Sequence, residues 1–137
     1  MFRSLCLRWS SKLIPLNGDL WRIVIVNPTN PQLVDRTGRL TVATTDPATY
    51  TIYMSSELTG GFFTHVLIHE LGHCAMISFN LLADIHQMVK PEYWIEAEEW
   101  VCNFIADYGE QLFKIAYAVD GDYAWRWIPG ELERLIS

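Results

Sequence analysis

The stretch of sequence that decides the fold runs from Phe62 to Leu82 and reads FFTHVLIHELGHCAMISFNLL. Its side chains are apolar almost all round, which predicts a helix buried in the middle of a domain. Inside it lies an H-E-x-x-H motif, from His69 to His73. Residues four apart share one helix face, so the two histidines can present ring nitrogens to a single zinc ion. Burying two imidazoles and a carboxylate without an ion would be costly, and the motif therefore predicts a metal site.

Glu70 follows His69 directly and lies about 100° round the helix. Its carboxylate can reach water that the ion activates without binding the ion itself, which predicts that Glu70 is the general base of a hydrolase. The simpler alternative is that both histidines are core residues with ordinary hydrogen bonds.

A catalytic zinc ion needs a third protein ligand and an open fourth position. No histidine lies six residues after His73. The next predicted helix, from Pro91 to about Ala118, supplies these carboxylates instead: Glu92, Glu96, Glu98, Glu99 and Glu110. Helical phase puts Glu98 nearer the apolar stripe, whereas Glu99 has Asn103 four residues later. On the residues alone, Glu98 and Glu99 both remain candidates.

In these two helices the sequence resembles the gluzincin zinc metallopeptidases. H-E-x-x-H followed by Glu99-Trp100-Val101-Cys102-Asn103 is similar to their paired motifs, and the run to Ile105-Ala106 is similar to ImmA/IrrE-like metallopeptidases, compact domains found on phages and mobile elements. The resemblance implies that Glu99 is the third ligand and that Asn103 hydrogen-bonds a metal-binding histidine. It also implies one Zn2+ per chain and a peptide lying extended along an edge strand.

Three strands are expected before the H-E-x-x-H helix, at residues 21–26 (WRIVIV), 39–45 (RLTVATT) and 49–55 (TYTIYMS). They are rich in β-branched and aromatic residues and are separated by turn-forming residues. Helical spacing from Phe2 to Leu13 predicts a short first helix, and a short last helix is expected to end at Ser137. The expected fold is a single α+β, zincin-like domain over residues 1–137, with a small sheet of about three strands packed on the two motif-bearing helices.

Other residues are weaker candidates for the site. His65 precedes His69 by four residues and could line the cleft, while His86 and Tyr93 could donate to an oxyanion. The strand at residues 49–55 is the candidate edge strand for substrate, through Tyr50, Ile52 and Tyr53. Cys74 and Cys102 adjoin proposed ligands, and small buried core residues are the better interpretation of both.

Composition and charge exclude several function classes. A hydrophobic share of 50% excludes intrinsic disorder. Sixteen acidic and ten basic side chains give a net charge of −6, without the basic stripe that nucleic acids or anionic membranes require. Three cysteines, an odd number in no paired spacing, and the lack of a signal-like or membrane-spanning run predict a soluble, cytoplasmic protein.

The sequence thus predicts a zinc metallopeptidase that acts on a peptide or protein substrate. The alternative is a zinc-stabilised binding or regulatory module, or a phage-associated one, without general proteolytic turnover. A purely structural zinc site needs no general base, and the presence of Glu70 favours the enzyme.

Overall fold

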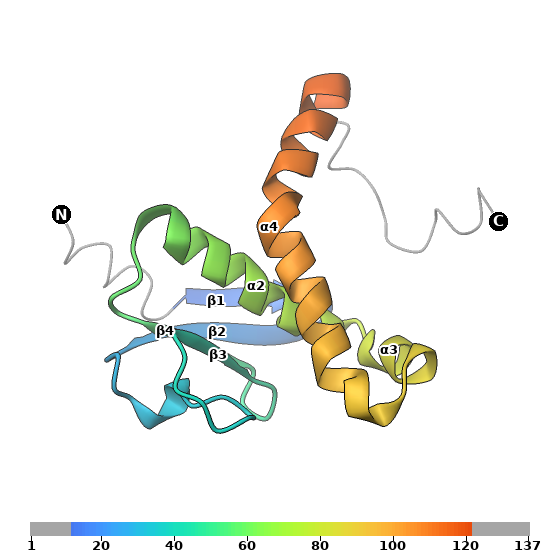
Figure 1. Ribbon diagram of the computed structural model, residues 1–137. Helices are drawn as coiled ribbons and strands as arrows, with labels where there is room; N and C mark the ends of the chain where they lie inside the picture. The colour runs from blue at the N-terminus through green and yellow to red at the C-terminus, as the bar shows by residue number, and fades with distance from the viewer. Residues whose placement is uncertain (1–11, 122–137) are drawn as a thin grey trace.

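The computed structural model describes residues 12–121, which form a four-stranded mixed sheet and three α-helices (Figure 1). The strands are β1 (Lys12–Leu16), β2 (Asp19–Val26), β3 (Ala43–Asp46) and β4 (Thr51–Ser55), and a short 3-10 helix, η1 (Pro31–Leu33), lies between β2 and β3. The helices are α2 (Gly60–Ser78), α3 (Leu82–Met88) and α4 (Trp94–Asp120), with a second 3-10 turn, η2 (Pro91–Tyr93), before α4. The α+β class predicted from the sequence is confirmed.

The sheet differs from the expectation in two ways, the number of its strands and the strand at its edge. The strand order is β1-β2-β4-β3, with β2 and β4 parallel and the other neighbours antiparallel. The sheet has four strands rather than about three, because residues 12–16 pair with β2 instead of continuing a helix from Phe2. In addition, β4 lies between two neighbours, so the expectation that residues 49–55 form the edge strand is wrong. The edge strand on that side is β3.

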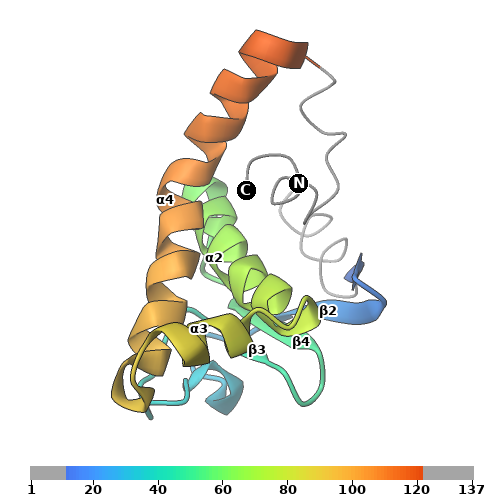
Figure 2. The same ribbon diagram turned by 90° about the vertical axis from the view of Figure 1, so that its right-hand side faces the viewer.

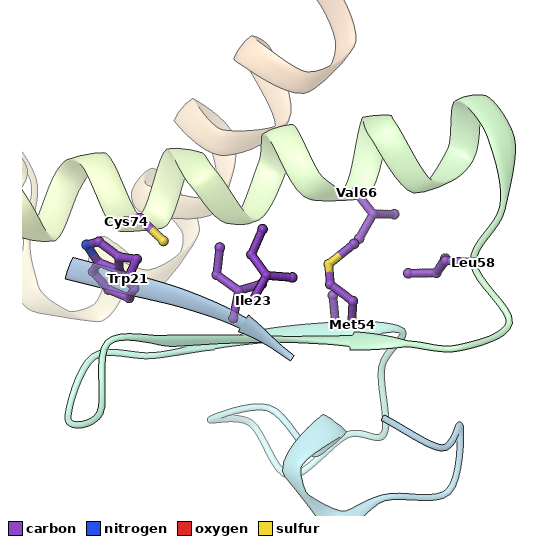
Figure 3. Close-up of a cluster of buried hydrophobic side chains, with 8 residues drawn as sticks. Trp21, Ile23, Met54, Leu58, Val66 and Cys74 are labelled. Carbon is purple, nitrogen blue, oxygen red and sulfur yellow. The ribbon is translucent and has the colours of Figure 1, made fainter. Parts of the chain in front are cut away.

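The core lies between the sheet and α2 (Figure 3). Alternate side chains of β2 and β4 face the helix, because successive residues of a strand point to opposite faces. The residues labelled there are Trp21, Ile23, Met54, Leu58, Val66 and Cys74, all buried. Nε1 of Trp21 donates to Oγ of Ser78 over 2.7 Å, which fixes the end of α2 on the sheet.

α4 packs against α2 at a steep angle, and its far half extends beyond the sheet (Figure 2). The two helices approach closely at one point, where a Cβ atom added at Gly72 would lie 3.0 Å from Sγ of Cys102. The sequence predicts both helices to within a few residues, whereas α3 at residues 82–88 is a helix that the sequence pattern does not predict. The expected helix that ends at Ser137 and most of the one from Phe2 lie outside the described residues.

Among residues 12–121, no single helix is long and apolar enough to cross a membrane. α2 and α3 reach that length and composition only together, and the chain bends by 86° between them.

Candidate metal centre

Two histidines of α2 and both carboxylate oxygens of Glu99 in α4 converge at the point where the two helices cross. Nε2 of His69 lies 3.1 Å from Nε2 of His73 and 3.1 Å from Oε2 of Glu99. Nε2 of His73 lies 3.4 Å from Oε1 of Glu99. His69 and His73 share one face of α2 because they are four residues apart. The first turns of α4 bring Glu99 opposite them. Among the described residues, this is the group of titratable side chains that could hold a metal ion.

The residues of this group fit a zinc ion. Zinc bonds to imidazole nitrogen and carboxylate oxygen are about 2.0–2.2 Å long, so a tetrahedral ion separates its ligand atoms by roughly 3.3–3.5 Å. Here the two Nε2 atoms are 3.1 Å apart, and they face different oxygens of Glu99, at 3.1 Å from His69 and 3.4 Å from His73. Two imidazoles and one carboxylate are also the ligand set of many catalytic zinc sites, which leave a fourth position open. The residue types therefore suit zinc, and one donor atom from each residue lies within 4.8 Å of the other two.

Glu98 lies behind His73 rather than among the converging atoms. Its Oε1 is 3.0 Å from Nδ1 of His73, and its Oε2 forms a 2.6 Å ion pair with Nη1 of Arg36. The side chain is buried, with 7% of its area exposed. Of the two carboxylates that the sequence left open, Glu99 faces the Nε2 atoms and Glu98 binds the opposite side of an imidazole ring.

The role expected for Asn103 is taken by Glu98. Asn103 is exposed on α4, and within residues 12–121 it makes no hydrogen bond with either histidine. The expectation that Asn103 is the partner of a metal-binding histidine is therefore wrong. The reason is the phase of α4, which turns residue 98 toward α2 and residue 103 toward solvent.

The charges at the site are strongly coupled. Burial disfavours the charged form of His73, but hydrogen bonds with Cys102 and the two glutamates outweigh it and raise the pKa of His73 to about 12. Burial also acts against the charge of Glu98, yet hydrogen bonds from His73 and Arg36 lower the pKa of that carboxyl. Hydrogen bonds from both imidazoles hold the pKa of Glu99 well below its usual range. In the metal-free protein these contacts are made by protons, which a bound cation would replace.

Glu70 is buried and is oriented by the edge strand. Oγ1 of Thr45, in β3, donates to Oε2 of Glu70 over 2.5 Å. Within residues 12–121, the side-chain hydrogen bond of Glu70 is made by Oε2, and Oε1 has no hydrogen-bond partner there. Glu70 therefore has one oxygen held by Thr45 and one without a partner among the described residues.

The remaining sequence candidates lie apart from these atoms. Nε2 of His65 pairs with Asp107 at 3.4 Å, one turn before His69 on α2. His86 stacks on Trp94 with ring centroids 3.9 Å apart, and Tyr93 is exposed beside it in η2. Within residues 12–121, none of these three makes a hydrogen bond or ion pair with His69, His73 or Glu99.

The side chains expected to contact substrate on residues 49–55 do not line a free edge. Ile52 is fully buried in the core. Tyr50 packs edge-on against Trp21 with ring centroids 5.0 Å apart. Tyr53 lies in β4, whose neighbours on both sides are other strands. The expected substrate contacts at these three residues are wrong for this reason.

Cys74 and Cys102 are free thiols in the core, as the sequence indicated. Burial raises the pKa of the Cys74 thiol to about 12, which keeps it protonated and a poor ligand. Neither cysteine belongs to the group of atoms that could hold a metal.

Comparison with known proteins adds no relative. No protein-family model matches the chain, and no curated protein matches it. The interpretation of the site therefore depends on its own side chains.

Proposed function

We propose that this protein is a zinc-dependent peptidase of the gluzincin type, with a zincin-like fold. His69, His73 and Glu99 would hold the ion, and Glu70 would be the general base. One observation carries the proposal: two histidines and a glutamate converge from two helices, while the carboxylate of Glu70 beside them is outside this group and is oriented separately by Thr45. A structural zinc site would have a fourth protein side chain as ligand, whereas a catalytic site leaves that position open to water or substrate.

The bound ion and Glu70 would have different roles in the reaction. Bound zinc would supply Lewis acidity, which polarises a carbonyl group and makes water nucleophilic at neutral pH. Glu70 would accept the proton from that water through Oε1, because Oε2 is occupied by Thr45. It would then pass the proton to the leaving amine. Thr45 restricts rotation of the carboxylate and so keeps the accepting oxygen toward the site.

The free edge of β3 supports an extended peptide as substrate. Ser55 N donates to Val42 O, so every second residue from Val42 onward pairs with β4. The peptide groups of Thr45 consequently point away from β4, toward the open edge. Since its side chain holds Glu70, a peptide that adds to β3 as a further strand would pass beside the general base.

A cleavage screen with a matched variant tests the function. The zinc-loaded wild type and Glu70→Gln are compared on a peptide library, because glutamine keeps the shape of the side chain but cannot accept the proton. Glu110→Gln, on the exposed part of α4, is the control for a lost carboxylate. We expect cleavage by the wild type and the control, a loss of about 10²–10⁴-fold in Glu70→Gln, and equal zinc content in all three. Equal cleavage by Glu70→Gln would contradict the proposal, and zinc binding without cleavage of any library would favour a binding module.

A further inference from the structure

Arg36 joins a distant loop to both glutamates of the site. Its Nη1 lies 2.6 Å from Oε2 of Glu98, and its Nη2 lies 3.3 Å from Oε1 of Glu99. The residue comes from the loop between η1 and β3, more than sixty positions before the two glutamates in the chain. Its guanidinium is planar, and its two terminal nitrogens each take a different carboxylate. Arg36 thus fixes the distance between the carboxylates of Glu98, which contacts His73, and Glu99, the proposed zinc ligand.

The buried Glu98 carboxylate depends on this cation. A buried carboxylate is unfavourable unless it is paired and hydrogen-bonded. Glu98 has two partners, Nδ1 of His73 on Oε1 and Arg36 on Oε2. If Arg36 were replaced by a neutral residue, Oε2 of Glu98 would lose its charged partner. The carboxylate would then turn toward solvent or toward another donor. The contact with His73 would then no longer hold the ring in one orientation.

The contact of Arg36 with Glu99 restricts the orientation of the second carboxylate. Oε1 of Glu99 faces both Arg36 and Nε2 of His73, whereas Oε2 faces Nε2 of His69. A carboxylate held on one oxygen by a guanidinium presents the other oxygen in a fixed direction. Arg36 therefore restricts how Glu99 can turn, and with it the number of oxygens that Glu99 can offer to an ion.

The loop that carries Arg36 is ordered by its own hydrogen bonds. Oδ1 of Asp35 accepts from N and Oγ1 of Thr37 and from N of Arg39, at 2.8, 2.6 and 3.1 Å. Gly38 has φ of 86°, a conformation that glycine adopts at little cost, and its N–H donates to Asp35 O. A bridge between Val34 and Leu40 closes the loop. The guanidinium is thus presented from a preorganised turn rather than from a free segment.

We propose that Arg36 is a positioning residue for the metal centre, which acts through Glu98 on His73 and directly on Glu99. This inference uses the metal site of the proposed function but does not depend on turnover. The loop at residues 35–39 is then part of the site, although no residue in it binds the ion. Removing the cation should loosen the ligand set while leaving all three ligands in the chain.

Metal affinity and a cobalt spectrum test the proposal. Arg36→Met keeps the length and apolar stem of the side chain without its charge, Arg36→Lys restores a cation that can face one carboxylate, and Arg39→Met removes the other arginine of the same turn. Zinc affinity is measured by competition with a chelator, and Co2+ absorption reports the coordination geometry. We expect Arg36→Met to lose about 10–100-fold in affinity with a changed cobalt spectrum, Arg36→Lys to recover part of both, and Arg39→Met to match the wild type.

A double-mutant comparison separates positioning from general stabilisation. If Arg36 acts mainly through Glu98, Arg36→Met should weaken zinc binding much less in a Glu98→Gln background than in the wild type. Should Arg36→Met fail to fold, Arg36→Lys and Asp35→Asn, which weakens the turn, are compared in the same assay. Wild-type affinity and an unchanged cobalt spectrum in the folded Arg36 variants would overturn the proposal. If the wild type binds zinc tightly but cleaves nothing, the proposed function fails while this inference is still measured.

Discussion

Oε1 of Glu98 lies 3.0 Å from Nδ1 of His73, on the side of the ring opposite the atoms that converge on His69. Because Oε2 of the same carboxylate pairs with Arg36, Glu98 is ionised and can only accept, so Nδ1 of His73 donates. In a neutral imidazole the lone pair is then on Nε2. Glu98 thereby selects the tautomer of His73 that can bind a metal.

This relationship predicts that Glu98 matters more to zinc affinity than Asn103. Glu98→Gln should weaken zinc binding by about 10–100-fold, because the amide is a poorer acceptor from His73 and has no charge for Arg36. Asn103→Ala should leave the affinity within about twofold, since Asn103 is exposed and makes no hydrogen bond with either histidine. Chelator competition on both variants is the measurement. The reverse order of effects would restore Asn103 as the partner of the ligand.

The metal content of histidine variants tests the ligand set itself. Wild-type protein should contain about one zinc per chain, and His69→Ala or His73→Ala should lose it, because two protein ligands remain in each. His65→Ala is the matched control, since His65 lies one turn earlier on α2 and pairs with Asp107 instead. Metal analysis after dialysis against a weak chelator gives the stoichiometry. Tightly held zinc in His73→Ala would refute the site.

Thr45 is expected to affect catalysis without affecting the metal. Thr45→Val removes the hydroxyl that holds Oε2 of Glu70 but keeps the β-branched shape that suits a strand. We expect kcat to fall about 10-fold, less than the 10²–10⁴-fold worth of general-base catalysis, because the base is still present but less well oriented. Thr44→Val is the control, since its hydroxyl donates to Gln32 O and not to Glu70. The measurement is steady-state kinetics on a peptide from the library, with the zinc content of each variant determined in parallel. An unchanged kcat in Thr45→Val would show that Thr45 does not orient the base.

The sequence predicts those parts of the fold that local patterns determine. The apolar run from Phe62 and the apolar stripe after Pro91 correspond to α2 and α4, and residues 21–26 lie in β2. β1 was missed because Leu13 continued a helical spacing from Phe2, whereas pairing with β2 decides its conformation. The position of β4 inside the sheet cannot be predicted in this way. Strand order depends on pairing between segments that are far apart in the chain, and the local periodicity and composition of each segment carry no information about that pairing.

The same distinction applies to the site. The spacing of His69, Glu70 and His73 is local, and the structure places the two histidines together as that spacing predicts. The choice between Glu98 and Glu99 depends on the phase of α4 against α2, which sequence leaves uncertain by one residue. Arg36 carries no local signal at all, because only folding brings residue 36 to residues 98 and 99.

The contact between Gly72 and Cys102 gives a prediction about stability. A methyl group at residue 72 would lie 3.0 Å from Sγ of Cys102 and 3.4 Å from its Cα and Cβ. Gly72→Ala should therefore push α4 away from α2, at a cost of about 1–3 kcal/mol for overpacking. Since α4 carries Glu99, zinc affinity should fall as well. Urea unfolding of the metal-free protein gives the first quantity and chelator competition the second.

Two further variants separate the steric effect from helix propensity. Gly61→Ala, in the first turn of α2 with no atom within 4 Å of the added Cβ, should be neutral or stabilise by up to about 1 kcal/mol. Cys102→Ala removes the sulfur and leaves space for the new methyl group, so Gly72→Ala should cost much less in that background. Additive costs in the double variant would mean that Sγ of Cys102 is not what limits the approach of α4 to α2, and the helix crossing that brings Glu99 to the histidines would need another explanation.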